Sequence, residues 1–261
     1  MSNIIEKDKS ATDLLVAHRG FSSDFPENTI IAIKAAVEEG AKYIEIDIQL
    51  TKDKKAILFH DRDLTRLCEE SGAIHDYNWN ELKSFSSFSP DLFLDKYKGQ
   101  SIATLDEIVN YLRDYPDVTL FVELKRISIS SFGIDTVLDS VLPLLNPIKN
   151  QCVIISFSLD IIESIRQTTD FPVAVVIDNW EEAIGTEFNR IKAIKPEFFF
   201  TDIDFLPEYG NISLLDSKIV VYECVDDEQA YNVLNRGVHL VETFNIREMK
   251  EKLNEKINHE I

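Results

Sequence analysis

The stretch YIEIDIQL, residues 43–50, decides the fold of this chain. Successive side chains of a β-strand point to opposite faces. One face of this segment carries four aliphatic side chains, and the other carries Tyr43, Glu45, Asp47 and Gln49. Two carboxylates two positions apart therefore point to the same side. That side is either exposed to water or part of a site that needs both charges.

Further short apolar segments along the chain have the composition of strands. They are residues 14–18, 56–60, 119–125, 152–157, 172–178, 197–202, 218–225 and 239–244. Helical patterns separate most of them, as in residues 28–40, 158–168 and 227–237, and the chain ends in an amphipathic segment, 245–260. Alternating strands and helices predict a parallel sheet covered by helices.

The link TKDKK, residues 51–55, is too short for a helical crossover. The segment 56–60 should therefore fold back on 43–50 as an antiparallel hairpin, which leaves eight parallel strands. The sequence predicts a (β/α)8 TIM barrel, with an open doubly wound sheet as the alternative. Residues 1–261 are expected to form a single domain, and the polar residues 1–13 a short arm before the first strand.

Residues 62–103 interrupt the alternation and read as an insertion after the hairpin. This segment is rich in Ser, Asp and aromatic residues and contains a possible short helix near 78–85. It could form a lid or a substrate wall at the mouth of the barrel. It could equally be a packed excursion on the surface.

Charge and composition argue against some classes of binding partner. The net charge of −19 argues against nucleic acids and anionic membrane surfaces, because both would be repelled. No apolar run approaches the roughly 20 residues that span a bilayer, so stable membrane insertion is not expected. Cys68, Cys152 and Cys224 fit neither a disulfide framework nor a zinc pattern. We expect a cytoplasmic protein, and the sequence does not determine its oligomeric state.

Barrel geometry gives the acidic face of residues 43–50 a location. Both faces of a barrel strand are buried, so the aliphatic face packs on helices while Glu45 and Asp47 point inward. The segment FVELK, residues 121–125, directs Glu123 and Lys125 inward in the same way. Three inward acids resemble a site for a hard cation such as Mg²⁺ or Ca²⁺. A structural ion-pair network, or an antiparallel strand with a solvent face, is the alternative.

Two histidines also end strands. His18 and Arg19 follow the first strand in VAHRG, residues 16–20, and His60 follows the hairpin in LFHD, residues 58–61. Active sites of such barrels form at the carboxyl ends of the strands. Two imidazoles near a divalent cation would suit acid–base chemistry at a phosphoryl centre. A structural role for each histidine is the alternative.

An ordered set of motifs resembles the glycerophosphodiester phosphodiesterase family. The motifs are HRG (18–20), PENT (26–29), EIDIQLTKD (45–53), LFHD (58–61), TLDEI (104–108) and VELK (122–125). The resemblance implies a (β/α)8 barrel with an insertion after the hairpin, as predicted above. It also implies metal-dependent hydrolysis of small-molecule glycerophosphodiesters to sn-glycerol 3-phosphate and an alcohol such as choline, ethanolamine or glycerol.

The resemblance assigns roles by position. It implies Mg²⁺ or Ca²⁺ held by Glu45, Asp47 and Glu123, and acid–base catalysis by His18 and His60. Arg19 matches the arginine that engages the phosphate, and Lys125 matches a lysine that adds a second positive charge. In PENT, Asn28 could cap the following helix and Glu27 could reach the site, or both could only shape the loop.

The last strands depart from the family pattern. Members usually carry Trp-Thr-Val-Asn on the penultimate strand, where this chain has Tyr222-Glu223-Cys224-Val225. The final strand tends to end in Thr-Asp, where this chain has Glu242-Thr243-Phe244. Tyr222 is expected to line the substrate pocket in place of the tryptophan. The preferred alcohol therefore stays open.

Two other functions stay open as well. A lysophospholipase D-type activity would need an apolar groove, which aromatic residues of the insertion could supply (Tyr77, Trp79, Phe85, Phe88 and Phe93). These side chains could instead form a small core of their own. The remaining alternative is a catalytically silent barrel that binds a phosphorylated ligand, although both histidines and all three acids are retained.

Overall fold

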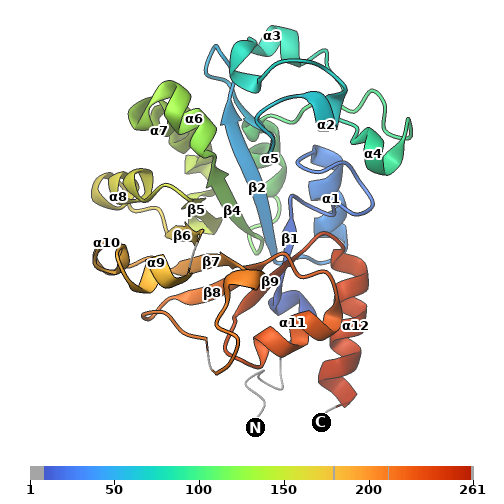
Figure 1. Ribbon diagram of the computed structural model, residues 1–261. Helices are drawn as coiled ribbons and strands as arrows, with labels where there is room; N and C mark the ends of the chain where they lie inside the picture. The colour runs from blue at the N-terminus through green and yellow to red at the C-terminus, as the bar shows by residue number, and fades with distance from the viewer. Residues whose placement is uncertain (1–8, 179, 211, 260–261) are drawn as a thin grey trace.

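The computed structural model describes residues 9–178, 180–210 and 212–259 (Figure 1). Most of the predicted N-terminal arm lies outside the described residues. Its end does not: Ala11–Asp13 form a 3-10 helix, η1, in which Ala11 is fully buried. The prediction of a frayed arm is therefore wrong for these three residues, because Ala11 belongs to the core.

All nine predicted strands are present. They are β1 (Leu15–His18), β2 (Tyr43–Leu50), β3 (Ala56–Leu58), β4 (Thr119–Leu124), β5 (Cys152–Ser156), β6 (Val173–Ile177), β7 (Phe198–Asp202), β8 (Lys218–Tyr222) and β9 (Leu240–Thr243). The first strand pairs in parallel with both β2 and β9, which closes the sheet into a ring. β3 pairs antiparallel with β2 and lies outside the ring. The (β/α)8 barrel is confirmed, and the open sheet is wrong because β1 has a partner on each side.

Helices surround the ring of strands (Figure 1). They are α1 (Ile30–Glu38), α5 (Leu105–Leu112), α6 (Arg126–Phe132), α7 (Ile134–Leu145), α8 (Leu159–Thr168), α9 (Trp180–Ile184), α10 (Phe188–Ile194), α11 (Asp227–Leu234) and α12 (Ile246–His259). Short 3-10 helices precede β5 and follow β7, η3 (Asn146–Gln151) and η4 (Ile203–Phe205). Among the described residues no single helix has the length and apolar composition to cross a membrane, although the bent pair 126–132 and 134–151 meets both criteria jointly.

The two faces of β2 pack as the alternation predicts. Ile44, Ile46 and Ile48 belong to the large core between the strands and the helices. The barrel interior below the acids is filled by a second core that includes Phe121 and Phe200, whose ring centroids lie 4.9 Å apart. Because aromatic rings close the lower interior, polar side chains can gather only at the carboxyl ends of the strands.

The insertion folds into short helices with a core of its own. They are α2 (Thr65–Cys68), η2 (Ile74–Asp76), α3 (Trp79–Leu82) and α4 (Pro90–Phe93). Tyr77, Trp79 and Phe85 pack against that core, and Phe88 is buried. Phe93 packs edge-on against Tyr97. The contacts of Tyr77, Trp79 and Phe85 fit the interpretation as a separate small core, which Phe93 does not join.

Candidate active site at the carboxyl ends of the strands

The three predicted acids meet inside the barrel. Asp47 on β2 is the register partner of Glu123 on β4. Together with Glu45 they offer carboxylate oxygens that all lie within 4.8 Å of one another. Their exposed fractions are 2% for Glu45, 1% for Asp47 and 9% for Glu123. The cluster is therefore almost completely removed from water.

Asp47 has more positively charged and hydrogen-bonding partners than the other two acids. Lys125 Nζ donates to its Oδ1 at 2.9 Å and Asn28 Nδ2 donates to its Oδ2 at 2.8 Å. Arg19 Nε lies 3.1 Å from the same Oδ2. Burial opposes ionisation of Asp47, but the charges of Lys125 and Arg19 outweigh it and hold its pKa well below the usual range. Asp47 is therefore a permanent anion.

The negative charges of Glu45 and Glu123 have fewer partners than that of Asp47. Among the described residues, Glu45 Oε2 accepts only a long hydrogen bond of 3.3 Å, from the Arg19 amide, and the buried Oε1 finds no hydrogen-bond partner. Burial and the Asp47 charge raise the Glu45 pKa well above its usual value. Burial also raises the pKa of Glu123, against the charge of Lys125, whose Nζ lies 3.0 Å away.

The donor set fits a hard divalent cation. Its atoms are all carboxylate oxygens, the ligands that Mg²⁺ and Ca²⁺ take in proteins. The unpartnered Glu45 Oε1 is an acceptor that a cation would satisfy. A positive charge would also remove the repulsion between Glu45 and Asp47 that raises the Glu45 pKa. The cluster can therefore hold such an ion.

His18 lies beside this cluster at the end of β1. Its ring stacks on Phe244, with centroids 4.9 Å apart. Its Nε2 lies 3.6 Å from Glu45 Oε2 and 3.7 Å from Glu242 Oε2, and its Nδ1 lies 3.6 Å from Glu223 Oε1. Burial, with the charge of Arg19, holds the pKa of His18 well below its usual value. The imidazole is therefore neutral near pH 7.

Glu242 is a site residue that sequence reasoning missed. It is 2% exposed on β9, and its Oε1 has no hydrogen-bond partner in the part of the chain that the structure describes. Burial raises its pKa well above the usual value. Strand alternation could have predicted its position, since Glu242 is two residues after Leu240 and so points to the same inward face. It stands in the part of β9 where the sequence departs from the family pattern.

His60 is fixed through both its backbone and its side chain. Gln49, on the inward face of β2, places Nε2 within 2.9 Å of the Phe59 carbonyl, 3.1 Å of the His60 carbonyl and 2.6 Å of the Asp61 carbonyl. The imidazole Nδ1 lies 2.8 Å from Asp61 Oδ1. An ionised carboxylate only accepts hydrogen bonds, so Nδ1 carries the proton and Nε2 is left for the cavity.

The residues of PENT join the site network. Glu27 accepts hydrogen bonds from Arg19 at 3.0 Å and from both terminal nitrogens of Arg66 at 2.8 and 2.9 Å. Asn28 does not cap the helix, so that prediction is wrong. Thr29 caps α1 by accepting from the Ala32 amide, while the Asn28 side chain is engaged by Asp47. Arg66, which α2 contributes, was not predicted.

A cavity of about 200 Å³ connects these side chains. Seven of the eight predicted site residues line it, and Asp47 lies directly behind Glu123 and Lys125. The Tyr222 ring forms a wall with Phe157, with centroids 6.5 Å apart and planes at 68°. The residues that line the cavity are His18, Arg19, Glu45, His60, Glu123, Lys125, Ile155, Phe157, Val176, Phe200, Tyr222, Glu223 and Glu242.

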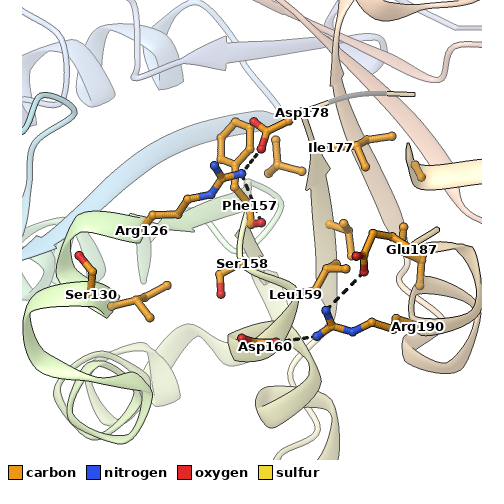
Figure 2. Close-up of a pocket in the computed structure, with 15 residues that line it drawn as sticks. Arg126, Ser130, Phe157, Ser158, Leu159, Asp160, Ile177, Asp178, Glu187 and Arg190 are labelled. Atoms are coloured by element: carbon orange, nitrogen blue, oxygen red, sulfur yellow. Dashed lines mark hydrogen bonds and ion pairs between the residues drawn. The ribbon is translucent and has the colours of Figure 1, made fainter. Parts of the chain in front are cut away.

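A larger groove of about 420 Å³ lies beside the mouth, at the ends of β5 and β6 (Figure 2). Its two arginines are already engaged with acids. Arg126 stacks on the Phe157 ring at 4.7 Å and pairs with Asp178. Arg190 pairs with Asp160 and Glu187, as Figure 2 shows. The groove contains neither of the two histidines nor the three-carboxylate cluster, which lie at the inner cavity.

Comparison with known proteins identifies the family of the chain. The model of the glycerophosphoryl diester phosphodiesterase family matches residues 18–243. The chain belongs to this family. A glycerophosphodiester phosphodiesterase of Caldanaerobacter subterraneus is 38% identical over 112 residues, which are 43% of this chain and 45% of that protein. Glycerophosphodiester phosphodiesterase 1 of Homo sapiens is 26% identical over 77% of this chain and 60% of its own length. The matched part thus spans about half the length of such relatives.

Solved structures share the fold of this family member. A phosphodiesterase from Oleispira antarctica, solved with its product sn-glycerol-3-phosphate, matches with a TM-score of 0.79 and 20% identity, over 94% of this chain and all of that chain. A glycerophosphodiester phosphodiesterase from Thermotoga maritima matches with a TM-score of 0.69 and 23% identity, over 91% of this chain and 97% of that chain. These likenesses establish the barrel architecture.

Proposed function

We propose that the protein hydrolyses glycerophosphodiesters to sn-glycerol 3-phosphate and an alcohol. One observation carries the proposal: a single cavity brings together two imidazoles, two cationic side chains and a three-carboxylate cluster. Membership of the family supports it, and so does the product found in the Oleispira antarctica enzyme. We further propose that residues 1–261 act as one domain on a small-molecule substrate and do not bind nucleic acid. We also propose a cytoplasmic location, because the three cysteines are free and a reducing compartment keeps thiols reduced.

Arg19 and Lys125 would bind the phosphate. Burial opposes protonation of each, but the charge of Asp47 raises the pKa of both above their usual values. Both side chains are therefore charged at neutral pH. The planar fork of Arg19 suits two phosphate oxygens, whereas Lys125 adds a point charge.

His18 and His60 would transfer the protons. One removes a proton from the attacking hydroxyl or water, and the other gives a proton to the departing alkoxide. Each is already oriented, His18 by Phe244 and its carboxylate neighbours, and His60 by Asp61. Glu45, Asp47 and Glu123 would hold Mg²⁺ or Ca²⁺, which neutralises phosphoryl oxygens and lowers the pKa of an adjacent hydroxyl.

Tyr222 would contact the alcohol or the glycerol. Its ring and that of Phe157 form the apolar wall of an otherwise charged cavity. The lysophospholipid alternative has less support, because Tyr77, Trp79 and Phe85, three of the five aromatic residues expected in its groove, pack against the core of the insertion. The glycerophosphodiester therefore has the stronger structural support as the substrate.

A single assay tests the proposal. The protein is incubated with glycerophosphocholine and separately with lysophosphatidylcholine, with Mg²⁺ or Ca²⁺, and released choline and glycerol 3-phosphate are measured. We expect release from glycerophosphocholine that EDTA abolishes. Release from the lysolipid alone would move the assignment to a lysophospholipase D, and no turnover of any diester would leave only a binding protein.

A further inference from the structure

We propose that Arg66 is a positioning residue that fixes His60 and Arg19 relative to each other. Arg66 lies outside the cavity and comes from α2 of the insertion, yet it contacts the carboxylate partners of both residues. The inference rests on the proposed function, in which His60 transfers a proton and Arg19 binds the phosphate. It gives the insertion a defined task in the reaction.

The first link runs from Arg66 to His60. Arg66 donates from Nε to Asp61 Oδ2 and from Nη2 to Asp61 Oδ1, each at 2.7 Å. Asp61 Oδ1 is also the atom 2.8 Å from His60 Nδ1. The two-pronged contact prevents the carboxylate from rotating, because both oxygens are held. Asp61 can therefore present one fixed acceptor to the imidazole, which directs Nε2 of His60 toward the cavity.

The second link runs from Arg66 to Arg19. Nη1 and Nη2 of Arg66 donate to the two oxygens of Glu27, at 2.8 and 2.9 Å. Glu27 Oε1 also accepts from Arg19 Nη1 at 3.0 Å, and Glu27 is 7% exposed. The Arg66 guanidinium thus shares Glu27 with Arg19 and limits how strongly Glu27 can draw Arg19 away from the phosphate position.

Removing Arg66 would leave two acids without a common partner. Ligand atoms of Glu27, His60 and Asp61 lie within 4.8 Å of one another. At such a separation two carboxylates repel each other unless a cation lies between them. Glu27 and Asp61 would then move apart, and each would carry its own partner, Arg19 or His60, with it.

The position of Arg66 is itself well determined. Leu67 and Cys68, which follow it in α2, are buried in the core of the insertion. The Leu67 carbonyl accepts from the amides of Phe88 and Ser89. Gln49 meanwhile holds the backbone of residues 59–61 from the barrel side. The loop that carries His60 is therefore held on one side by the barrel and on the other by the insertion.

The chain offers a matched control. Arg190 also forms ion pairs with several acids, Asp160, Glu163 and Glu187, and its side chain is 40% exposed, against 38% for Arg66. It lies on the outer groove and contacts no residue of the inner cavity. Arg190→Met thus removes a comparable ion network without touching the proposed machinery.

The experiment compares Arg66→Met, Arg66→Lys and Arg190→Met in the full chain. We expect kcat/KM for glycerophosphocholine to fall about 10- to 100-fold in both Arg66 variants, with a lower kcat and a higher KM. Arg190→Met should stay within about twofold of the wild type. Lysine should not rescue, because it lacks the fork. In an additional variant, Arg66→Ala, added guanidinium chloride should partly restore turnover, and an equal concentration of NaCl should not.

A double-mutant cycle separates positioning from a general structural role. If Arg66 acts through His60, Arg66→Met should lower kcat/KM by a much smaller factor in a His60→Gln background than in the wild type. Equal costs in both backgrounds, or equal losses in Arg66→Met and Arg190→Met, would overturn the proposal. A second readout needs no turnover: the His60 Nδ1 proton should give a hydrogen-bonded NMR signal that Arg66→Met loses and Arg190→Met keeps. If the wild type cleaves no diester, the proposed function fails, while this signal still tests Arg66.

Discussion

Glu45 and Asp47 lie on the same inward face of β2 but have opposite electrostatic environments. Asp47 has Lys125, Asn28 and Arg19 as partners, which hold its pKa well below the usual range despite its burial. Glu45 has one long hydrogen bond and an oxygen without a partner, and burial raises its pKa. Neighbouring acids of one strand therefore make opposite contributions to stability.

Neutralising these two acids should change stability in opposite directions. Asp47→Asn leaves Lys125 and Arg19 buried without their shared anion, so unfolding free energy in EDTA should fall by about 3–5 kcal/mol. Glu45→Gln removes a poorly solvated charge, and stability without metal should not fall. Urea unfolding at pH 7, with EDTA present, measures both. A large loss in Glu45→Gln would contradict the environment described for this side chain.

The pH dependence of stability should reveal Glu242. Burial raises its pKa above the unfolded value, so the folded state binds the extra proton and wild-type stability falls as pH rises through that window. Glu242→Gln cannot titrate. Its free energy of unfolding should equal that of the wild type at about pH 4 and exceed it by about 1–3 kcal/mol at neutral pH. Urea unfolding in EDTA across this range tests it, and a constant difference would argue against a raised pKa.

Both histidines should be essential for turnover and dispensable for folding. His18→Ala and His60→Ala should each lose about 10²- to 10⁴-fold in kcat, the usual effect of removing a general acid or base. Circular dichroism and the thermal midpoint show whether each variant is folded. His75, which lies outside the cavity in η2, provides the control for replacing a histidine. Near-normal rates in either variant would refute that assignment.

Tyr222 should affect substrate binding more than chemistry. Tyr222→Ala removes the ring that faces Phe157, and KM should rise about tenfold, equivalent to about 1.4 kcal/mol of aromatic contact. Tyr222→Phe keeps the ring and should change KM little. Steady-state kinetics with glycerophosphocholine and glycerophosphoglycerol measure the effect and its dependence on the alcohol. A fall in kcat at unchanged KM would instead place Tyr222 in the chemical step.

Strand periodicity predicted much of the site. A period of two placed Glu45, Asp47 and Glu123 inside the barrel, and the strand ends located His18 and His60. These positions depend only on local alternation and on ring closure, which is why the sequence reveals them. The same rule applied to β9 would have found Glu242, whose neighbour Leu240 points to the same interior.

Other features depend on contacts between distant segments, which no local pattern encodes. Arg66 belongs to a four-residue helix of the insertion, and only the packing of that segment brings it to Glu27 and Asp61. Asparagine is a common helix-cap residue, but the Asn28 side chain is hydrogen-bonded to Asp47. Thr29 therefore caps α1 instead. Tyr222 lines the cavity as the family's tryptophan predicted, whereas Glu223 and Glu242 line it at positions where the sequence departs from the family pattern.

The hairpin of β2 and β3 has a consequence for how the barrel can diverge. Since β3 returns beside β2, residues 18–60 alone supply both histidines, Arg19 and two of the three clustered acids. Tyr222, Glu223 and Glu242 reach the cavity from β8, the residue after it and β9, which lie on the other side of β1 from β2 and come late in the chain. The proposed acid–base residues and the side chain proposed to contact the alcohol thus come from separate stretches of sequence. Under the proposed function, substitutions in the later stretch could therefore change which alcohol fits the cavity, while both histidines and Arg19 stay unchanged.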